Sequence, residues 1–275
     1  MNRRLDRWNR TGSLGMRAWG WAVAVAGAWL GTAGAWSQTV VSASATASQG
    51  GVASASASGS RGAVVGAHAH AGFGGVADAE AQGQGRVVVT STAAALEGQA
   101  TSRIRGDGRL GGRVVGHSNA LTVGGEARSR VDLAARGPEA LVIGQGTAAS
   151  ELGVASTQVV GRARGNALTE VHGTALGRPG GLAQTQVRGT AVGLRSGAAH
   201  LSLEGIADAR DGLAQTHVAG RSVGVRGGFA RVSGQGVAVQ PGWRRPAAVR
   251  VDAFGRADQL GHVDVRVQGI DYPDW

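Results

Sequence analysis

The chain has 275 residues, of which 49 are glycine, 5 are proline and none is cysteine, and only 4% are aromatic. The lack of cysteine excludes disulfides, thiolate metal sites and cysteine nucleophiles, and the shortage of bulky apolar residues argues against an ordinary globular core. All 28 basic residues are arginine, and five of them lie within residues 1–17, so the formal charge of +10 overstates the excess elsewhere. The remaining excess is too small to indicate specific nucleic-acid binding.

Residues 1–35 have the pattern of a secretory signal peptide with a signal helix. A basic segment, residues 1–17, precedes an uncharged apolar run, and Ala33, Gly34 and Ala35 offer small residues for cleavage. We expect a secreted or cell-surface protein of a bacterium, with no integral membrane span after cleavage. The alternative is a single transmembrane anchor, because residues 18–36 contain no charge.

Residues 36–60 form a low-complexity segment of Ser, Ala and Gly. This segment has almost no bulky apolar side chain, so it buries little surface against the entropy of ordering its backbone. We expect it to become ordered only when it stacks on a neighbouring segment.

Residues 61–240 contain a repeated pattern of period two, Gly-x-Ala-x-Thr-x-Val-x-Gly-x-Ala. Its copies begin at Gly165, Gly181, Gly197 and Gly212, and most are spaced by 15 to 16 residues. Alternation of this kind indicates a β-strand with Ala, Thr and Val on one face and polar residues on the other. The Gly-, Pro- and Asp-containing links between the copies are typical of turns.

The repeat predicts an all-β fold, a β-solenoid in which each 15–16-residue unit forms one coil. The small inner side chains favour this architecture, because its sheets approach closely, and the inner glycines Gly173, Gly189, Gly205 and Gly220 would turn its corners. An antiparallel β-meander or barrel is the alternative, with one strand and one turn per unit.

Residues 241–275 depart from the repeat. Two strictly alternating segments, residues 248–254 and 262–268, are separated by a seven-residue link, which predicts a β-hairpin. Aromatic residues gather in and beside this region, so we expect it to cap the end of the repeat array.

No catalytic, cofactor-binding or metal site is predicted. His68 and His70 share one face of a strand, but no third ligand follows at a fitting spacing, and motifs for hydrolases and nucleotide binding are absent. The one candidate surface is a set of arginines that would attract an anionic polysaccharide: Arg188, Arg195, Arg221, Arg226 and Arg231. The alternative is that these arginines serve solubility and protect strand edges.

The Ala-x-Ala-x-Ala-x-Gly runs at residues 51–59 and 75–85 resemble the head repeats of trimeric autotransporter adhesins, and the cysteine-free, glycine-rich repeats resemble curli subunits. These resemblances imply a bacterial β-repeat surface protein. We therefore expect a non-enzymatic structural or interaction protein, a fibre subunit or adhesin of the cell surface or extracellular matrix, that associates with itself or with a surface partner. The alternatives are an outer-membrane β-barrel protein and a secreted polysaccharide-active β-helix enzyme.

Overall fold

The computed structural model describes residues 39–60, 62–109, 112–177, 181–194, 197–209, 212–225, 228–240, 247–257 and 262–273. The predicted signal peptide, residues 1–35, lies outside these residues, and Trp36–Trp275 forms one compact unit. Within the described ranges, no helix has the length and apolar character needed to cross a membrane.

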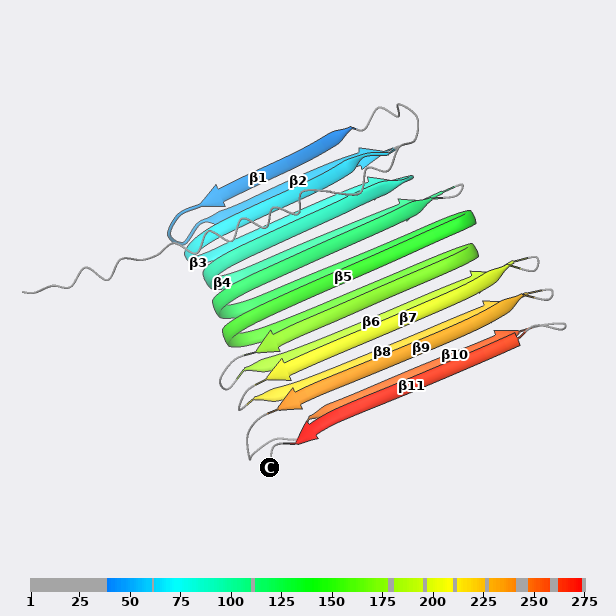
Figure 1. The fold of residues 1–275 in the computed structure, drawn as a ribbon. Coiled ribbons are helices and arrows are strands. Elements are labelled where there is room, and N and C mark those ends of the chain that lie inside the picture. Colours follow the sequence, from blue (N-terminus) through cyan, green and yellow to red (C-terminus); the bar gives the residue numbers. More distant parts are fainter. Residues whose placement is uncertain are drawn as a thin grey trace, which may run out of the picture. The chain divides into compact units, whose positions relative to one another are not determined.

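The described chain is almost entirely β-strand (Figure 1). The strands are β1 (Val40–Ala47), β2 (Val52–Ser60), β3 (Val64–Gln84), β4 (Val87–Gly108), β5 (Arg113–Gly177), β6 (Leu182–Gly193), β7 (Ala198–Ala209), β8 (Leu213–Gly224), β9 (Phe229–Gln240), β10 (Ala248–Ala257) and β11 (His262–Pro273). The strands pair in parallel and in register. A solenoid requires this parallel pairing, whereas a meander would pair its neighbouring strands antiparallel. The predicted all-β solenoid is confirmed, with about 7 turns.

The length of one coil differs from the expectation of 15–16 residues. A coil contains roughly 28 residues over the whole solenoid and 31 where Leu182 pairs with Leu213, so two repeat units make one turn. β6 therefore pairs with β8, two units along, and places Gln184 opposite Gln215, while β7 pairs with β9. The inner pattern of one unit does not reveal this length, because the same Ala-x-Thr-x-Val pattern recurs in units of both sheets.

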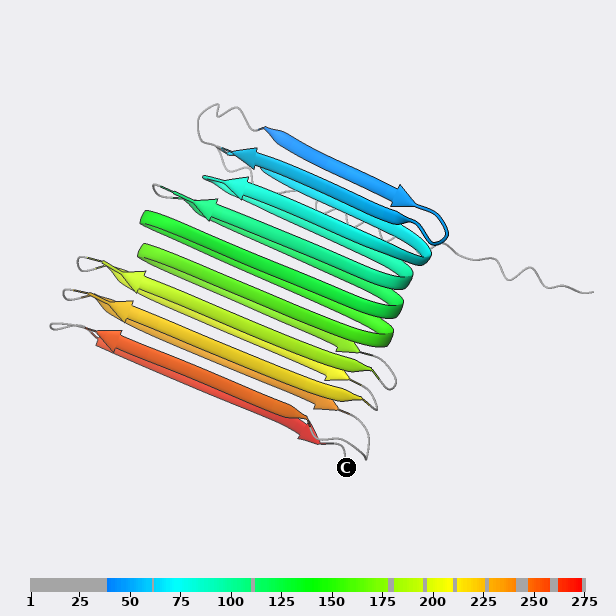
Figure 2. The same cartoon turned by 180° about the vertical axis from the view of Figure 1, so that it is seen from behind.

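Because of this coil length, successive units alternate between two sheets that lie back to back (Figures 1 and 2). We call the sheet with β2, β6, β8 and β10 the β8 sheet, and the sheet with β1, β7, β9 and β11 the β9 sheet. The long strands β3, β4 and β5 bend between the two and contribute segments to both.

The coils begin inside the segment predicted to be of low complexity. β1 and β2 both pair in register with β3, and the inward side chains of β2, Ala53, Ala55 and Ala57, are buried. The expectation that this segment is ordered by stacking on a neighbour agrees with this arrangement.

The inner glycines of the repeat do not turn corners, which corrects that part of the prediction. Gly173 and Gly205 lie in the middle of strands and face the opposite sheet. A Cβ atom on Gly173 would lie 2.8 Å from Val187 Cγ2 and 2.9 Å from Thr185 Cγ2. One on Gly205 would meet Thr216 and Val218 equally closely. These two glycines make room for a Thr-x-Val pair of the next unit, and Gly189 does the same for Leu201 and Leu203, so the sheets approach closely around this fit.

The corners are formed instead by glycines that lie between strand segments. Gly98 and Gly125 have φ values of 142° and 122°, and they stack in register on consecutive coils. A Cβ atom on Gly125 would collide with the carbonyl oxygen of Gly98. Glycine is therefore required here both by conformation and by the close approach of the next coil.

Many buried hydroxyls in the interior find partners, although none is found among the described residues for Thr122 Oγ1 and Thr169 Oγ1. Ser118 Oγ donates to Ser102 Oγ at 2.8 Å, and Ser129 Oγ donates to Ser118 Oγ at 2.9 Å, so one hydrogen-bonded chain crosses between the sheets. Farther along, the inward Thr185 donates to the carbonyl oxygen of Ile206 at 2.6 Å, and Thr216 to that of Val237 at 2.7 Å. These contacts offset the cost of burying polar groups.

The C-terminal segment does not form the predicted hairpin. β10 pairs in parallel with β8, and β11 pairs in parallel with β9, so the two strands lie on opposite sheets and add one more coil. Their alternation fits either arrangement, but Val249 and Val251 of β10 fill the space beside Gly236, as in the other repeats. Phe254 is 52% exposed and points outward, so it does not cap the interior.

Candidate functional site

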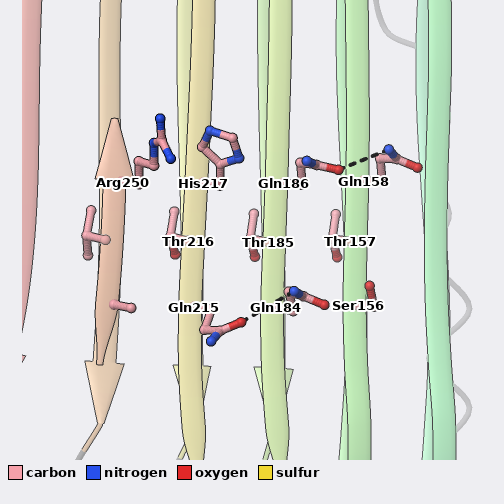
Figure 3. A pocket seen from close by; sticks show the side chains of 12 residues that line it. Ser156, Thr157, Gln158, Gln184, Thr185, Gln186, Gln215, Thr216, His217 and Arg250 are labelled. Carbon is pink, nitrogen blue, oxygen red and sulfur yellow. Dashed lines mark hydrogen bonds between the residues drawn. The ribbon is translucent and has the colours of Figure 1, made fainter. Parts of the chain in front are cut away.

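The outer surface of β6, β8 and β10, which we call the β8 face, carries stacked rows of polar side chains (Figure 3). The register places Gln184 beside Gln215 and Gln186 beside His217. Gln184 Nε2 donates to Gln215 Oε1 at 3.4 Å, and Gln158 Nε2, on the preceding coil, donates to Gln186 Oε1 at 3.1 Å. The rows arise because parallel, in-register coils place equivalent outward residues side by side.

The row formed by Gln158, Gln186 and His217 leads to a cluster that contains the charged side chains of Arg250 and Asp252. His217 Nε2 lies 3.3 Å from Asp252 Oδ2, and Arg250 Nε donates to the same oxygen at 2.8 Å. The hydrogen bond with His217, together with Arg250, lowers the pKa of Asp252 below its ordinary value. Asp252 is therefore held as a carboxylate whose charge is already compensated.

Beside this cluster lies a hollow between Arg188, Arg221, Asp252 and Phe254. The short Ala219 side chain also lines it, in register between Arg188 on β6 and Asp252 on β10. The guanidinium carbon of Arg221 lies 5.7 Å from the centre of the Phe254 ring, within reach of a cation–π interaction. Arg188 is exposed and has no carboxylate partner in the part of the chain that the structure describes.

The β9 face, the outer surface of β7, β9 and β11, differs in charge. The strands of the β8 face carry four arginines against one acid: Arg188, Arg221, Arg250, Arg256 and Asp252. On the β9 face, Arg231 and Arg266 both pair with Asp264, at 3.2 and 3.5 Å, and Glu204 and Asp208 add further negative charge. Only the β8 face is strongly cationic.

The structure divides the arginines predicted from the sequence. Arg188 and Arg221 lie together at the hollow on the β8 face. Arg231 lies on the β9 face, where it pairs with Asp264 and stands over the Phe229 ring at 5.3 Å. Arg195 and Arg226 lie outside the described residues. The predicted surface is therefore not one continuous patch.

Sequence reasoning missed the other members of the β8 face, namely the glutamine rows, His217, Arg250 and Phe254. Comparison of every second repeat could have found them, because Gln184-x-Gln186-x-Arg188 aligns with Gln215-x-His217-x-Ala219 at the coil length. The same comparison assigns Arg231 to the other sheet.

The histidine pair that was weighed as a metal site remains without a third ligand. His68 and His70 are exposed on the β9 sheet beside Thr92 and Ala94, and the nearby acids Asp78 and Glu80 lie on the β8 sheet. Among the described residues, no group of three or more potential ligands comes together.

Comparisons of the chain with protein-family models, with curated proteins and with solved structures found no match.

Proposed function

We propose that the protein is a non-catalytic interaction rod that holds an extended polymer along its β8 face. It would act outside a bacterial cell, as an adhesin or a subunit of the extracellular matrix. The observation that carries this proposal is the row arrangement of the β8 face, where consecutive coils offer similar polar groups in register. A partner built of repeating units can meet such a surface at many points.

Repetition gives this face its strength as a binding surface. Neighbouring rungs of a parallel sheet are about 4.8 Å apart, so each added unit of the partner meets another row of side chains. One contact with an exposed amide or guanidinium is weak, but after the first contact the next ones form intramolecularly at a high effective concentration. Affinity should therefore depend on the length of the partner more than on any single group.

Binding to polysaccharide fragments of graded length tests this proposal. The full processed chain is titrated with fragments of acidic, neutral and amino polysaccharides by isothermal calorimetry. We expect at least one class to bind, with an affinity that rises steeply with fragment length until the fragment spans the rows. If no class binds, or if a monosaccharide binds as tightly as a long fragment, the proposal is wrong.

A second candidate function is that of a fibre subunit, and the last coil favours it. Val265 and Val267 of β11 point in the same direction as Val232 and Gly234 of the preceding coil, yet they are 42% and 49% exposed. A second copy stacked against β11 would cover these side chains and continue the parallel pairing. Electron microscopy of the processed chain should then show filaments that Val265→Glu abolishes, and dispersed particles at high concentration would exclude this candidate.

A further inference from the structure

The hollow on the β8 face combines two guanidinium groups with an exposed aromatic ring. Arg188 lines the hollow from β6, and Arg221, the register neighbour of Phe254 on β8, lies over the Phe254 ring. A guanidinium that stacks on a ring keeps its N–H groups free at its edge, where they can bind a carboxylate with two hydrogen bonds. The hollow therefore offers anion-binding groups together with an apolar surface.

The Phe254 ring fits a ligand that is partly apolar. The ring is 52% exposed on the outer surface of the sheet. A ligand that covered it would remove apolar surface from water, which is favourable. The C–H face of a pyranose ring is a suitable partner for an aromatic face, whereas a simple inorganic anion would leave the ring uncovered. The small Ala219 side chain provides the depth for such a ring between the longer neighbours.

The glutamine rows supply groups that bind hydroxyls. In each pair, Gln184 with Gln215 and Gln158 with Gln186, one N–H and one carbonyl lone pair are used between the amides. The second N–H of each amide and the remaining acceptor sites are left for a ligand. Amides that are oriented by each other in this way lose less entropy on binding hydroxyl groups.

Charge selects an acidic ligand over a neutral one. Arg188 and Arg221 line the hollow, whereas Arg250 pairs with Asp252, which also contacts His217. A carboxylate placed over the hollow thus meets Arg188 and Arg221, while the charge of Asp252, which lines the hollow beside Ala219, is compensated by Arg250. Nucleic acid is less suitable, because Phe254 is the one Phe, Tyr or Trp side chain on β6, β8 and β10, and single strands are bound by several stacking rings.

We propose that the β8 face binds an acidic polysaccharide laid across the strands, along the direction in which the coils stack. A uronate carboxylate binds Arg188 and Arg221, its sugar ring covers Phe254, and the hydroxyls of neighbouring sugars bind the glutamine rows. A sugar residue and one rung of the sheet are similar in length, so successive sugars lie over successive coils. This inference rests on the proposed function and adds the class of the polymer.

The experiment compares polygalacturonate fragments with the same fragments after full methyl esterification, which removes the charge and keeps the sugar. Both are titrated into the full processed chain at low and moderate salt. We expect the charged form to bind at least about tenfold more tightly, and its affinity to fall with added salt. Dextran sulfate in parallel shows whether the site accepts sulfate as well as carboxylate; in either case the anionic sugar class is supported.

Two double variants with the same change of charge locate the binding. Arg188→Gln with Arg221→Gln should weaken polygalacturonate binding about tenfold or more, while Arg231→Gln with Arg266→Gln on the β9 face should leave it within about twofold. The circular dichroism spectrum confirms that both variants fold. In addition, Phe254→Ala should lower affinity for the charged and the esterified fragments alike, because it removes ring contact and not charge.

Three outcomes would overturn the inference. Equal losses in the two double variants would mean that only net charge matters, and tighter binding of single-stranded DNA than of polygalacturonate would assign the face to nucleic acid. Equal binding of the charged and esterified fragments would refute the acidic class but leave the proposed function standing. Failure of every polysaccharide to bind would overturn both.

Discussion

The β8 and β9 faces share one backbone plan but carry opposite chemistry. Both consist of parallel coils in register, with glycine and branched side chains meeting inside. Outside, the strands of the β8 face place Arg188 and Arg221 around a hollow, whereas on the β9 face Arg231 is neutralised by Asp264. The interior fixes which residue types recur, and the exterior positions remain free to diverge, so one scaffold presents two distinct surfaces.

The largest expected effect comes from a change to the interior that both faces share. Gly189→Val would push a branched side chain into Leu201 and Leu203 of the opposite sheet. We expect a loss of about 2–3 kcal/mol or more in the free energy of unfolding, because the close-packed sheets cannot separate locally. Thermal unfolding followed by circular dichroism measures this loss.

The outward neighbour provides the control for that variant. Thr190→Val lies one residue along and points away from the interior, so it should change the free energy of unfolding by no more than about 0.5 kcal/mol. Equal melting temperatures for the two variants would contradict the inward assignment of Gly189.

A reversal of charge on the β8 face should erase the difference between the faces. Arg188→Glu with Arg221→Glu replaces both guanidiniums of the hollow by carboxylates. We expect the affinity for polygalacturonate to fall about 100-fold, which corresponds to about 2.7 kcal/mol, because repulsion replaces attraction. Calorimetry on the folded variant measures it, and retention of more than a tenth of the affinity would place the binding elsewhere.

A loss of one glutamine row should have a smaller effect. Gln184→Ala removes an amide that donates to Gln215 and offers its second N–H to a ligand. We expect a decrease of about threefold to fivefold in affinity, from a net contribution of about 1 kcal/mol per hydrogen bond. Gln235→Ala, an exchange of the same residue type on the β9 face, is the control and should leave affinity unchanged.

The smallest expected effects are opposite pH dependences on the two faces. Hydrogen bonding with His217 lowers the pKa of Asp252, so its stabilising contribution is present above the ordinary value of 3.8 and is lost as the pH falls through the lowered pKa. Burial raises the pKa of Asp208 on the β9 face, so its carboxylate destabilises the fold as the pH rises from 3.8 through the raised pKa.

Two single variants separate these contributions. At pH 7, Asp252→Asn should lower the melting temperature slightly and Asp208→Asn should raise it slightly, because the first removes a favourable charge and the second an unfavourable one. Melting curves from pH 3 to pH 7 check both signs. Shifts of the same sign in the two variants would contradict the difference between the faces.

Much of the fold could be predicted from the local pattern. Alternation of Ala214, Thr216 and Val218 with polar residues identifies strands and their inner face, and the recurrence of the unit predicts a solenoid. The inner residues alone do not give the number of units in a coil, because Ala-x-Thr-x-Val occurs in units of both sheets, as at Thr169 and Thr185; only the outer residues of every second unit carry this information. The hairpin prediction for residues 248–268 was wrong for a related reason: its alternating strands fit equally well onto β8 and β9.

The candidate site could be predicted only in part, and the coil length explains why. Residue type indicates Arg188, Arg221 and Arg231 alike as surface cations, and only the two-unit coil separates Arg231, which lies on the other sheet. The inner glycines were assigned to corners because glycine is common in turns, yet Gly173 serves to admit the methyl groups of Thr185 and Val187. Contacts between the two sheets do not appear in the pattern of one strand.

The pairing of each unit with the copy two places along builds the β8 face, and cysteine cross-linking tests it directly in a chain without native cysteine. Register neighbours in a sheet have Cα atoms about 4.8 Å apart, within the range that a disulfide spans. Gln186→Cys with His217→Cys should oxidise rapidly, while Gln186→Cys with Ser202→Cys, one unit along on the other sheet, should not. Cross-linking of the second pair instead of the first would contradict the two-unit coil and the binding face built on it.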